Sequence, residues 1–456
     1  MKKYILFFIL AITSSINAQQ QLSFSFGEIP QNLMLNPGAE TNFKSHYGIP
    51  VFSNLSFKAG FTGFTLADLF LNDSRDFNLK FEEVLNKIDS DDYININTVV
   101  EVLSAGLRID DKTYVSFGFY EELDLITYFP KDITELVYYG NEPFLNRPFS
   151  ISELVMKADM LGVLHAGMSR KVDEKLTIGG RLKIYSSSLN IETNNNSGTI
   201  TATTNNTNII RQTLDNLDAE IRTSGITDSN GDANESFNDV FSNTLLGGNL
   251  GLGFDVGLTY HFSPQLEFTG SIIDVGFIKY SKNIRNYTAK GNYILDGINF
   301  EYNSDDPSDY WEQLEEDFNA NVPTGETENT YTSWRPMKIN AALKYSFGEK
   351  RSKFCYTKTH KQYYYNSIGF QIHTIMRPLK PQLSFTSFYE KSFSKKIHTK
   401  FTHTINDYSA AIFGVATSLR VGKLNIFGVL DNILAVTDVA SANNISLNFG
   451  FNIVIN

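Results

Sequence analysis

Oxygen-bearing side chains at alternate positions form the arrangement in this sequence that comes nearest to a metal site. Asp228, Asn230 and Asp232 alternate with other residues, and Asp239 follows further along the chain. Such a spacing resembles the ligand pattern of a calcium loop. However, Ala233 stands where that loop needs a glycine for its sharp turn. The sequence therefore favours a solvated polar loop over a calcium site.

The seven histidines give no second candidate for a metal site. His398 and His403 are an odd number of residues apart, so on a strand they face opposite ways. His165 and His261 are expected on an inward face, each as a lone solvated side chain. The sequence has no glycine-rich phosphate loop, zinc-spaced cysteine set or nucleophile elbow. We therefore expect no enzyme activity and no cofactor.

Charged residues within apolar alternating segments are a further candidate for function. If the apolar face of these segments meets lipid, the charges must face inward, because a charge facing lipid costs roughly 2–4 kcal/mol near the midplane. The predicted lumen-facing residues are Arg181, Lys183, Asp255, Glu267, Lys338 and Lys344. For these residues, an ordinary charged lining of the lumen is favoured over a filter that selects solutes.

The elements that would position these charges are about fourteen segments in which apolar and polar residues alternate. In the segment 249–262 every second residue is large and apolar, while the residues between are mainly glycine or polar. Alternation of this kind is typical of β-strands with two different faces. The other segments are 49–60, 99–109, 113–128, 159–170, 175–190, 266–280, 337–347, 363–376, 382–389, 397–405, 409–421, 423–431 and 443–455.

The connections distinguish a membrane barrel from a soluble sheet, which also alternates. The long gaps, 61–98, 129–158, 191–248 and 281–336, all fall at one end if each strand reverses direction. The sequence therefore predicts an all-β protein, a transmembrane antiparallel β-barrel with long extracellular loops and short periplasmic turns. Apolar spacing predicts loop helices over 77–88, 208–221 and 309–318. A cap over the barrel is favoured for these helices over a gate.

The start of the chain predicts export. Lys2 and Lys3 precede a short apolar run and then Ala18, as in a signal peptide over residues 1–18. Residues 19–48 are then expected as a periplasmic or lumenal segment, and 49–456 as a barrel in the outer membrane. The net charge of −11 disfavours nucleic acid as a partner. The single cysteine, Cys355, excludes an internal disulfide.

Several short motifs, in their order, resemble a known family. They are Met34-Leu-Asn-Pro-Gly-Ala39, Tyr47-Gly-Ile-Pro-Val51, Gly60-Phe-Thr-Gly-Phe64, Tyr128-Phe-Pro-Lys-Asp132, Tyr138-Tyr-Gly-Asn141 and Ser271-Ile-Ile-Asp-Val-Gly-Phe-Ile278. Together they resemble the DUF5723 family of Bacteroidota outer-membrane proteins, over nearly the whole mature chain. More distantly, the pattern is similar to FadL-like and PorV-like barrels. The family implies no established activity.

Two functions remain open at this point. The first is a FadL-like barrel that passes or binds a small hydrophobic molecule, with its N-terminal segment tucked into the lumen. The second is a non-transporting scaffold or accessory of surface secretion or gliding machinery, with envelope proteins as partners. Outer-membrane lipid is a partner in both cases.

Overall fold

Fourteen antiparallel strand positions close into a barrel, which confirms the predicted fold class. The structure is a computed structural model that describes residues 20–204, 210–226, 243–295, 324–349, 364–436 and 438–455. Pairing between β2 and β21 completes the circle. In order around the wall the strands are β1 (Ser45–Gly48) with β2 (Asn54–Phe61), β3 (Tyr93–Arg108), β4 (Thr113–Tyr128), β6 (Met156–Lys171), β7 (Leu176–Thr193), β10 (Asn249–His261), β11 (Leu266–Tyr280), β15 (Lys338–Glu349), β16 (Tyr364–Ile375), β17 (Gln382–Ser392), β18 (Ile397–Asn406), β19 (Ile412–Val421), β20 (Leu424–Leu430) and β21 (Asn444–Ile455).

The first strand position is interrupted, where the sequence predicts one segment over 49–60. β1 and β2 both pair with β21 and β3, and residues 49–53 bulge out between them. Val51 has a φ of 68° and donates its N–H to the carbonyl of Val102. Val102 itself lies in a bulge of β3. The two irregularities therefore face each other and leave the pairing on both sides intact.

The wall has its apolar side chains outside and its charges inside. On β7, Leu182 is 72% exposed, whereas its neighbours Arg181 and Lys183 are 5% and 3% exposed. On β16, Phe370 is 71% exposed beside Gln371 at 3%. This distribution is the reverse of a water-soluble sheet, which buries its apolar face.

The two ends of the barrel differ in their connections. Short turns at 109–112, 172–175, 262–265, 393–396 and 422–423 lie at one end, which we call the turn end. The N-terminal start of β1 and the C-terminal end of β21 lie there too, since Ser45 pairs with Ile455. The opposite end, which we call the loop end, carries most of the long connections, whereas residues 350–363 join β15 to β16 at the turn end.

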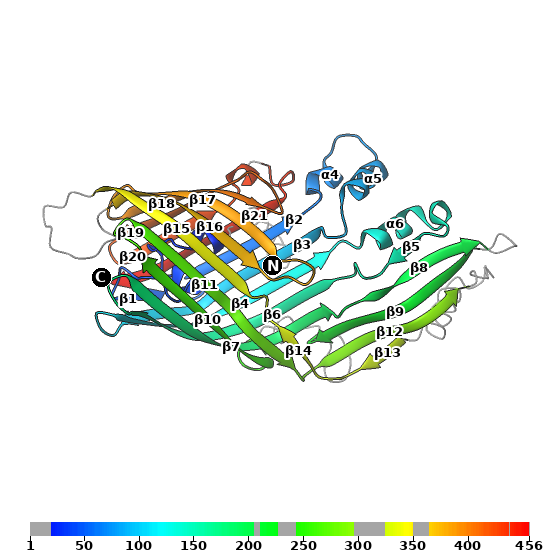
Figure 1. The fold of residues 1–456 in the computed structure, drawn as a ribbon, viewed down its shortest axis with the longest axis horizontal. Helices are drawn as coiled ribbons and strands as arrows, with labels where there is room; N and C mark the ends of the chain where they lie inside the picture. The colour runs from blue at the N-terminus through cyan, green and yellow to red at the C-terminus, as the bar shows by residue number, and fades with distance from the viewer. Residues whose placement is uncertain are drawn as a thin grey trace, which may run out of the picture.

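Short helices cover part of the loop end (Figure 1). They are α4 (Leu66–Phe70), α5 (Phe77–Lys87), α6 (Lys131–Tyr139), η1 (Glu142–Phe144) and η3 (Ile433–Val436). The helix predicted over 77–88 is confirmed as α5. Its buried Val84 and Leu85 pack with Phe64 and Phe129 into a small apolar core.

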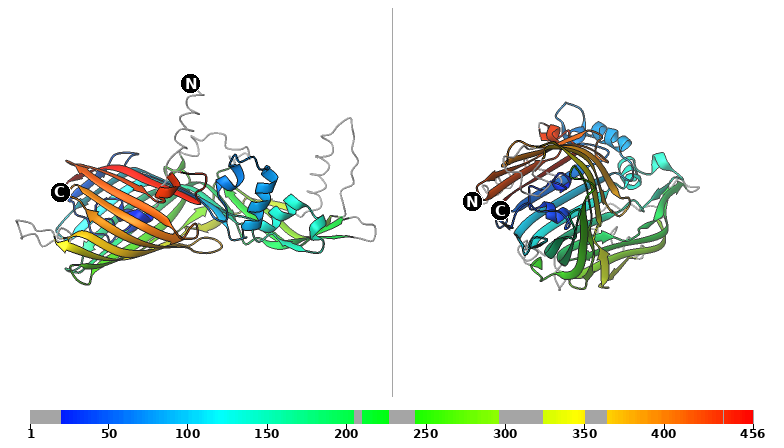
Figure 2. Two further views of the ribbon diagram at one scale, coloured as in Figure 1. Left: turned by 90° about the horizontal axis from the view of Figure 1, so that it is seen from above. Right: turned by 60° about the vertical axis from the view of Figure 1, so that its left-hand side comes forward.

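A sheet extends from the barrel beyond the loop end (Figures 1 and 2). It contains β5 (Pro148–Ser150), β8 (Ser197–Thr204), β9 (Ile210–Ser224), β12 (Ile284–Leu295) and β13 (Thr324–Thr327), while β14 (Tyr331–Trp334) pairs with β11. The extension joins the wall through the pairing of β7 with β9.

The helix predicted over 208–221 is wrong, because this stretch forms β9. β9 pairs with β8 and β12, and both ladders shift register near Leu217. A bulge adds one residue to the two-residue period of a strand. The apolar positions Leu214, Leu217 and Ile221 then have spacings of three and four, which imitate a helix. The helix predicted over 309–318 lies outside the described residues.

No helix in the described part of the chain is long and apolar enough to cross a membrane. The described helices all lie at the loop end or at the start of the chain. The latter are α2 (Gln20–Ser23) and α3 (Asn32–Leu35). Both lie inside the ring of strands (Figure 2).

Candidate functional site: the plugged lumen

The N-terminal segment 22–44 fills the turn-end half of the barrel, and we call it the plug. Its backbone is held by side chains of the wall. The Lys400 ammonium donates to the carbonyl of Phe24 at 2.7 Å, and the Ser271 hydroxyl donates to the carbonyl of Leu35 at 2.6 Å. The Arg181 guanidinium donates to the carbonyl of Leu33. Backbone carbonyls buried without helix or sheet partners are thereby satisfied.

Gln31 connects the plug to the wall beside the barrel closure. Its amide nitrogen donates to the Ser53 carbonyl at 3.0 Å and to the Glu101 carboxylate at 3.0 Å. The side chains of Gln31 and Asn452 also exchange hydrogen bonds at 3.1 Å. One plug residue therefore contacts β3, β21 and the bulge between β1 and β2.

Apolar side chains of the plug sit in apolar patches of the wall. Three buried clusters combine residues from both. The first joins Leu22, Phe26 and Ile29 to Ala416, Phe427 and Val429. The second joins Phe24 and Leu35 to Ile273, Ala342 and Phe388. The third joins Leu33, Ala39 and Phe43 to Tyr114 and Val454.

Two wall glycines create space for the turn at Asn36 and Pro37. Gly179 on β7 and Gly257 on β10 are register partners. A Cβ on Gly179 would lie 2.0 Å from the Pro37 carbonyl oxygen, and a Cβ on Gly257 would lie 1.9 Å from Asn36 Oδ1. The close approach of the plug backbone to Gly179 and of the Asn36 side chain to Gly257 requires glycine at both positions. The Asn36 amide then donates to Thr269 Oγ1 at 2.7 Å.

Eight buried charged side chains form one chain of ion pairs across the lumen, beside and beyond the plug. We call it the ion chain. It runs Arg181–Asp255–Lys183–Asp274–Lys338–Glu122–Arg335–Asp159, with contacts of 3.0, 3.0, 2.5, 2.9, 3.5, 2.7 and 3.3 Å. Cations and anions alternate, so the chain is electrically balanced. Balance matters because an unpaired buried charge costs several kcal/mol or more.

Asp274 has a special backbone conformation within the ion chain. Its φ is 62°, in the left-handed region that aspartate tolerates better than most residues. The β10–β11 register shifts here, and the Asp274 N–H donates to Asp255 Oδ1 at 2.7 Å. The bulge lets Ile273 and Asp274 both point inward, so one strand supplies an apolar and an acidic group side by side.

A separate ion pair joins the wall across the loop end. Arg377, in the connection between β16 and β17, contacts Asp124 on β4 at 2.5 Å. β4 and β16 lie on nearly opposite sides of the wall. Together with the ion chain, this contact places protein across the lumen between the plug and the loop end.

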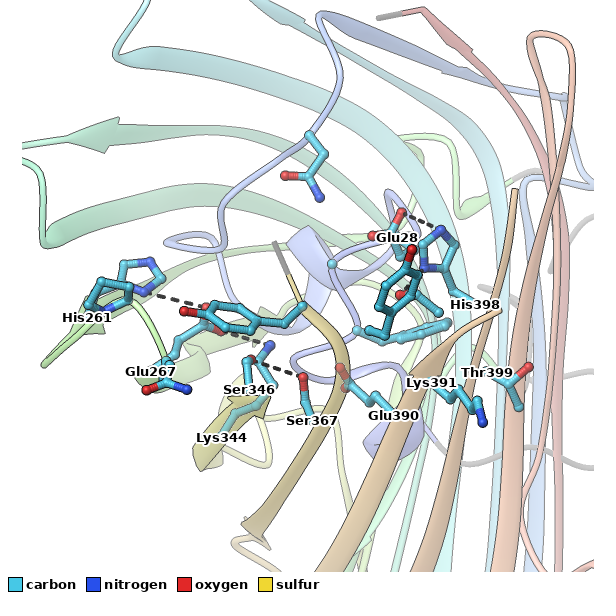
Figure 3. A pocket seen from close by; sticks show the side chains of 18 residues that line it. Glu28, His261, Glu267, Lys344, Ser346, Ser367, Glu390, Lys391, His398 and Thr399 are labelled. Atoms are coloured by element: carbon cyan, nitrogen blue, oxygen red, sulfur yellow. Dashed lines mark hydrogen bonds and ion pairs between the residues drawn. The ribbon is translucent and has the colours of Figure 1, made fainter. Parts of the chain in front are cut away.

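A small polar cavity lies at the turn end between plug and wall (Figure 3). Its volume is about 80 Å³. Figure 3 shows His261, Glu267 and Lys344 on one side and Glu28 with His398 on the other. His398 Nε2 lies 3.6 Å from a Glu28 oxygen, and His261 Nε2 lies 3.2 Å from a Glu40 oxygen. Both acidic residues of the plug therefore face a wall histidine.

The structure places all the predicted lumen-facing residues inside the barrel. Arg181, Lys183, Asp255 and Lys338 join the ion chain, while Lys344 pairs with Glu267 at 3.0 Å. The calcium candidates Asp228, Asn230, Asp232 and Asp239 lie outside the described residues.

Sequence reasoning missed the other half of the ion chain, namely Glu122, Asp159, Asp274 and Arg335. Asp274 belongs to the motif 271–278, which carries the family resemblance. Glu122 ends a stretch of β4 where five consecutive residues, 118–122, are buried, which hides the alternation. Arg335 precedes β15 and lies in a gap between predicted strands. For Glu122, Asp159 and Asp274, the sequence does carry a signal, namely an acidic residue within an alternating apolar segment.

A family model described as "Family of unknown function (DUF5723)" matches residues 37–431. The chain belongs to this family. The DUF5723 match begins inside the plug and spans every member of the ion chain. Among curated proteins, no match is found.

Solved structures similar to this DUF5723 chain include three barrels. The toluene transporter TbuX of Ralstonia pickettii has 9% identity and a TM-score of 0.42, with 94% of each chain covered. A FadL homologue of Pseudomonas aeruginosa has 8% identity and a TM-score of 0.43, covering 96% of this chain and 98% of that one. The toluene transporter TodX of P. putida has 8% identity and a TM-score of 0.39, covering 97% and 96%.

Proposed function

We propose that this protein is an outer-membrane barrel that binds or passes a small hydrophobic molecule, with the plug as its movable closure. The observation that carries the proposal is the occupation of apolar wall patches by apolar plug side chains. The long loops and the extended sheet would lie outside the cell, and the turn end would face the periplasm.

The inverted side-chain distribution supports placement in a membrane. Exposed Leu182 and Phe370 belong to a broad outer surface of leucine, isoleucine and phenylalanine. In water such a surface would promote aggregation, because each large apolar side chain gains about 1.5–3 kcal/mol on burial. Lipid covers this surface, and the closed ladder leaves no strand edge unpaired in the membrane.

The plug supports the choice of a hydrophobic ligand. Displacing Phe24 and Leu35 from Ile273, Ala342 and Phe388 would expose apolar surface on both partners. A hydrophobic molecule entering the wall patch would restore about the same burial on the wall side. The free energy that the wall loses when the plug leaves would then be nearly regained when a hydrophobic ligand binds. A polar solute would leave the apolar wall patch without apolar contacts.

The extended sheet favours a second function, contact with another envelope protein. β9 and β12 extend beyond the barrel and carry exposed apolar residues, among them Ile221, Tyr287 and Ile294. A scaffold or accessory barrel would use such a surface to hold a partner. This function predicts stable co-purification with an envelope protein from gently solubilised membranes.

Adjacent alanines on β15 provide the test of the hydrophobic ligand. Ala342 is buried in the wall patch, whereas Ala341 lies on the outer face between exposed Leu343 and half-exposed Ile339. Binding of a fluorescent long-chain fatty acid would be measured on protein in lipid nanodiscs, with empty nanodiscs as the blank. We expect saturable binding that Ala342→Phe weakens about tenfold, or about 1.4 kcal/mol, by filling the patch. Ala341→Phe should bind like the wild type. Absence of saturable binding, or equal loss in both variants, would contradict the proposal.

A further inference from the structure

Three metal-ligating side chains converge at the turn end from three separate elements. Glu40 belongs to the plug, His261 is the last residue of β10 and Glu267 is the second residue of β11. Their ligand atoms all lie within 4.8 Å of one another. Glu40 Oε1 is 3.2 Å from His261 Nε2, and Glu267 Oε2 is 3.8 Å from His261 Nδ1.

We propose that Glu40, His261 and Glu267 bind one divalent cation of the zinc class, which fastens the plug to the barrel wall. Two carboxylates and one imidazole form a ligand set that zinc accepts in tetrahedral sites, with a water or solute as the fourth ligand. Ligands of a tetrahedral zinc ion lie roughly 3.3 Å apart, given bonds of about 2.0–2.2 Å. A single ion takes only one ring nitrogen of His261, so the three ligand atoms would close from separations of up to 4.8 Å to this distance. Calcium and magnesium prefer oxygen ligands alone, so the imidazole disfavours them.

Neighbouring groups already orient the two carboxylates. The Thr177 hydroxyl donates to Glu40 Oε1 at 3.1 Å. Lys344 Nζ contacts the other oxygen of Glu267, Oε1, at 3.0 Å, while Oε2 faces His261. Partners of this kind fix the direction of ligands around a metal. The two carboxylates and Lys344 together carry one negative charge, which favours a cation there.

The position of Glu40 gives the site a consequence for the barrel. Asn36 and Gly38, just before it in the plug, are bound to the same two strands as the ligands. The Asn36 amide donates to Leu258 on β10 and to Thr269 on β11, and the Thr259 hydroxyl donates to the Gly38 carbonyl. A cation bound by Glu40 would add one more link next to these hydrogen bonds, on the side nearer the turn end. It would therefore hold the plug in place independently of any molecule that the lumen binds.

The other histidine of the cavity serves as the matched control. His398 also faces a plug carboxylate, Glu28, at 3.6 Å. Its Nδ1 lies 2.8 Å from the Ser392 hydroxyl. Among the described residues it belongs to no group of three metal-ligating side chains. His398→Ala removes a plug–histidine contact in the same cavity without removing a ligand.

The experiment titrates the full mature chain in detergent with zinc chloride, using calorimetry and metal analysis after desalting. We expect one zinc ion per chain, and affinity lowered at least tenfold in His261→Ala, Glu40→Gln and Glu267→Gln. His398→Ala should keep the wild-type affinity and stoichiometry. Calcium and magnesium chloride should not compete at equal concentration. Each variant is first checked for the heat-dependent mobility shift of a folded barrel, so that loss of binding is not loss of fold.

A second readout connects the metal to the plug. Zinc should raise the temperature at which the folded band disappears, because a ligand that binds only the folded state stabilises it. EDTA should reverse the effect, and His261→Ala should abolish it while His398→Ala keeps it. A folded wild-type protein that binds no zinc would overturn the proposal. Zinc binding that persists unchanged in folded His261→Ala and Glu40→Gln would overturn it too, because the ion would then lie elsewhere.

Discussion

Gly179 and Gly257 are register partners on neighbouring strands, and together they form the flat spot on the lumen wall against which Asn36 and Pro37 lie. Neither position has room for a Cβ. The position of the plug therefore depends on having glycine, with no Cβ, at both of these wall positions.

Gly179→Val is expected to expel the plug, because its Cβ would collide with the Pro37 carbonyl. The adjacent Gly180→Val is the control, since a Cβ there has only one neighbouring atom, the Asp255 carbonyl oxygen at 3.8 Å. Chymotrypsin cleavage after Phe24, Phe26 or Leu35, followed by mass spectrometry, measures plug release. The wild type and Gly180→Val should resist cleavage, and Gly179→Val should be cut. Equal resistance in both variants would mean that the glycine pair does not position the plug.

Asp274→Asn is expected to destabilise the barrel by about 3 kcal/mol or more, because it leaves Lys183 and Lys338 with too little negative charge in a buried site. Asparagine tolerates the left-handed backbone, so the change tests charge and not conformation. Urea unfolding in lipid vesicles measures the loss. Asp218→Asn is the control: Asp218 pairs with Lys290 at 3.0 Å with both side chains more than half exposed. That variant should change stability by at most about 1 kcal/mol.

Two turns should give the barrel an acid-sensitive step. Asp110 accepts from the N–H groups of Lys112 and Thr113, each at 2.7 Å, and Asp173 accepts from those of Lys175 and Leu176 at 2.7 and 2.8 Å. These backbone hydrogen bonds lower the pKa of both carboxyls below the ordinary 3.8.

A lowered pKa means that the stabilisation is complete above pH 3.8 and is lost as the pH falls through the folded-state pKa. Asparagine accepts the same hydrogen bonds without titrating. Urea midpoints measured over this acidic range should fall less steeply for the double variant Asp110→Asn, Asp173→Asn than for the wild type. Parallel curves would show that the two turns do not titrate with folding.

The strands could be predicted because the wall has two different faces. Apolar side chains outside and polar side chains inside impose a two-residue period, and segments 113–128 and 266–280 match β4 and β11 residue for residue. Where a bulge interrupts the period, as near Leu217 in β9, the same reasoning gave a helix. The alternation of apolar and polar residues thus predicts a strand only where no bulge shifts that alternation by one residue.

The contacts inside the lumen could not be predicted, because they form only when the strands close into a barrel. The alternation within one segment does not show which strands face each other. The inward face of Lys338 followed from its segment, but its contact with Glu122 needs β4 and β15 to face each other across the barrel. Arg335 and Arg377 reach the lumen from connections, where alternation gives no direction. The position of Glu40 beside His261 likewise depends on the path of the plug through the closed ring.

Conductance across a planar lipid bilayer tests most directly whether the plug closes the barrel. The protein over residues 19–456, with its plug, should insert with little steady conductance. A variant lacking residues 22–43, which keeps Lys44 and its hydrogen bond to Ile455, should show steady open steps. If the intact protein already conducts as much as the shortened one, the plug does not close the lumen and this account of the site is wrong.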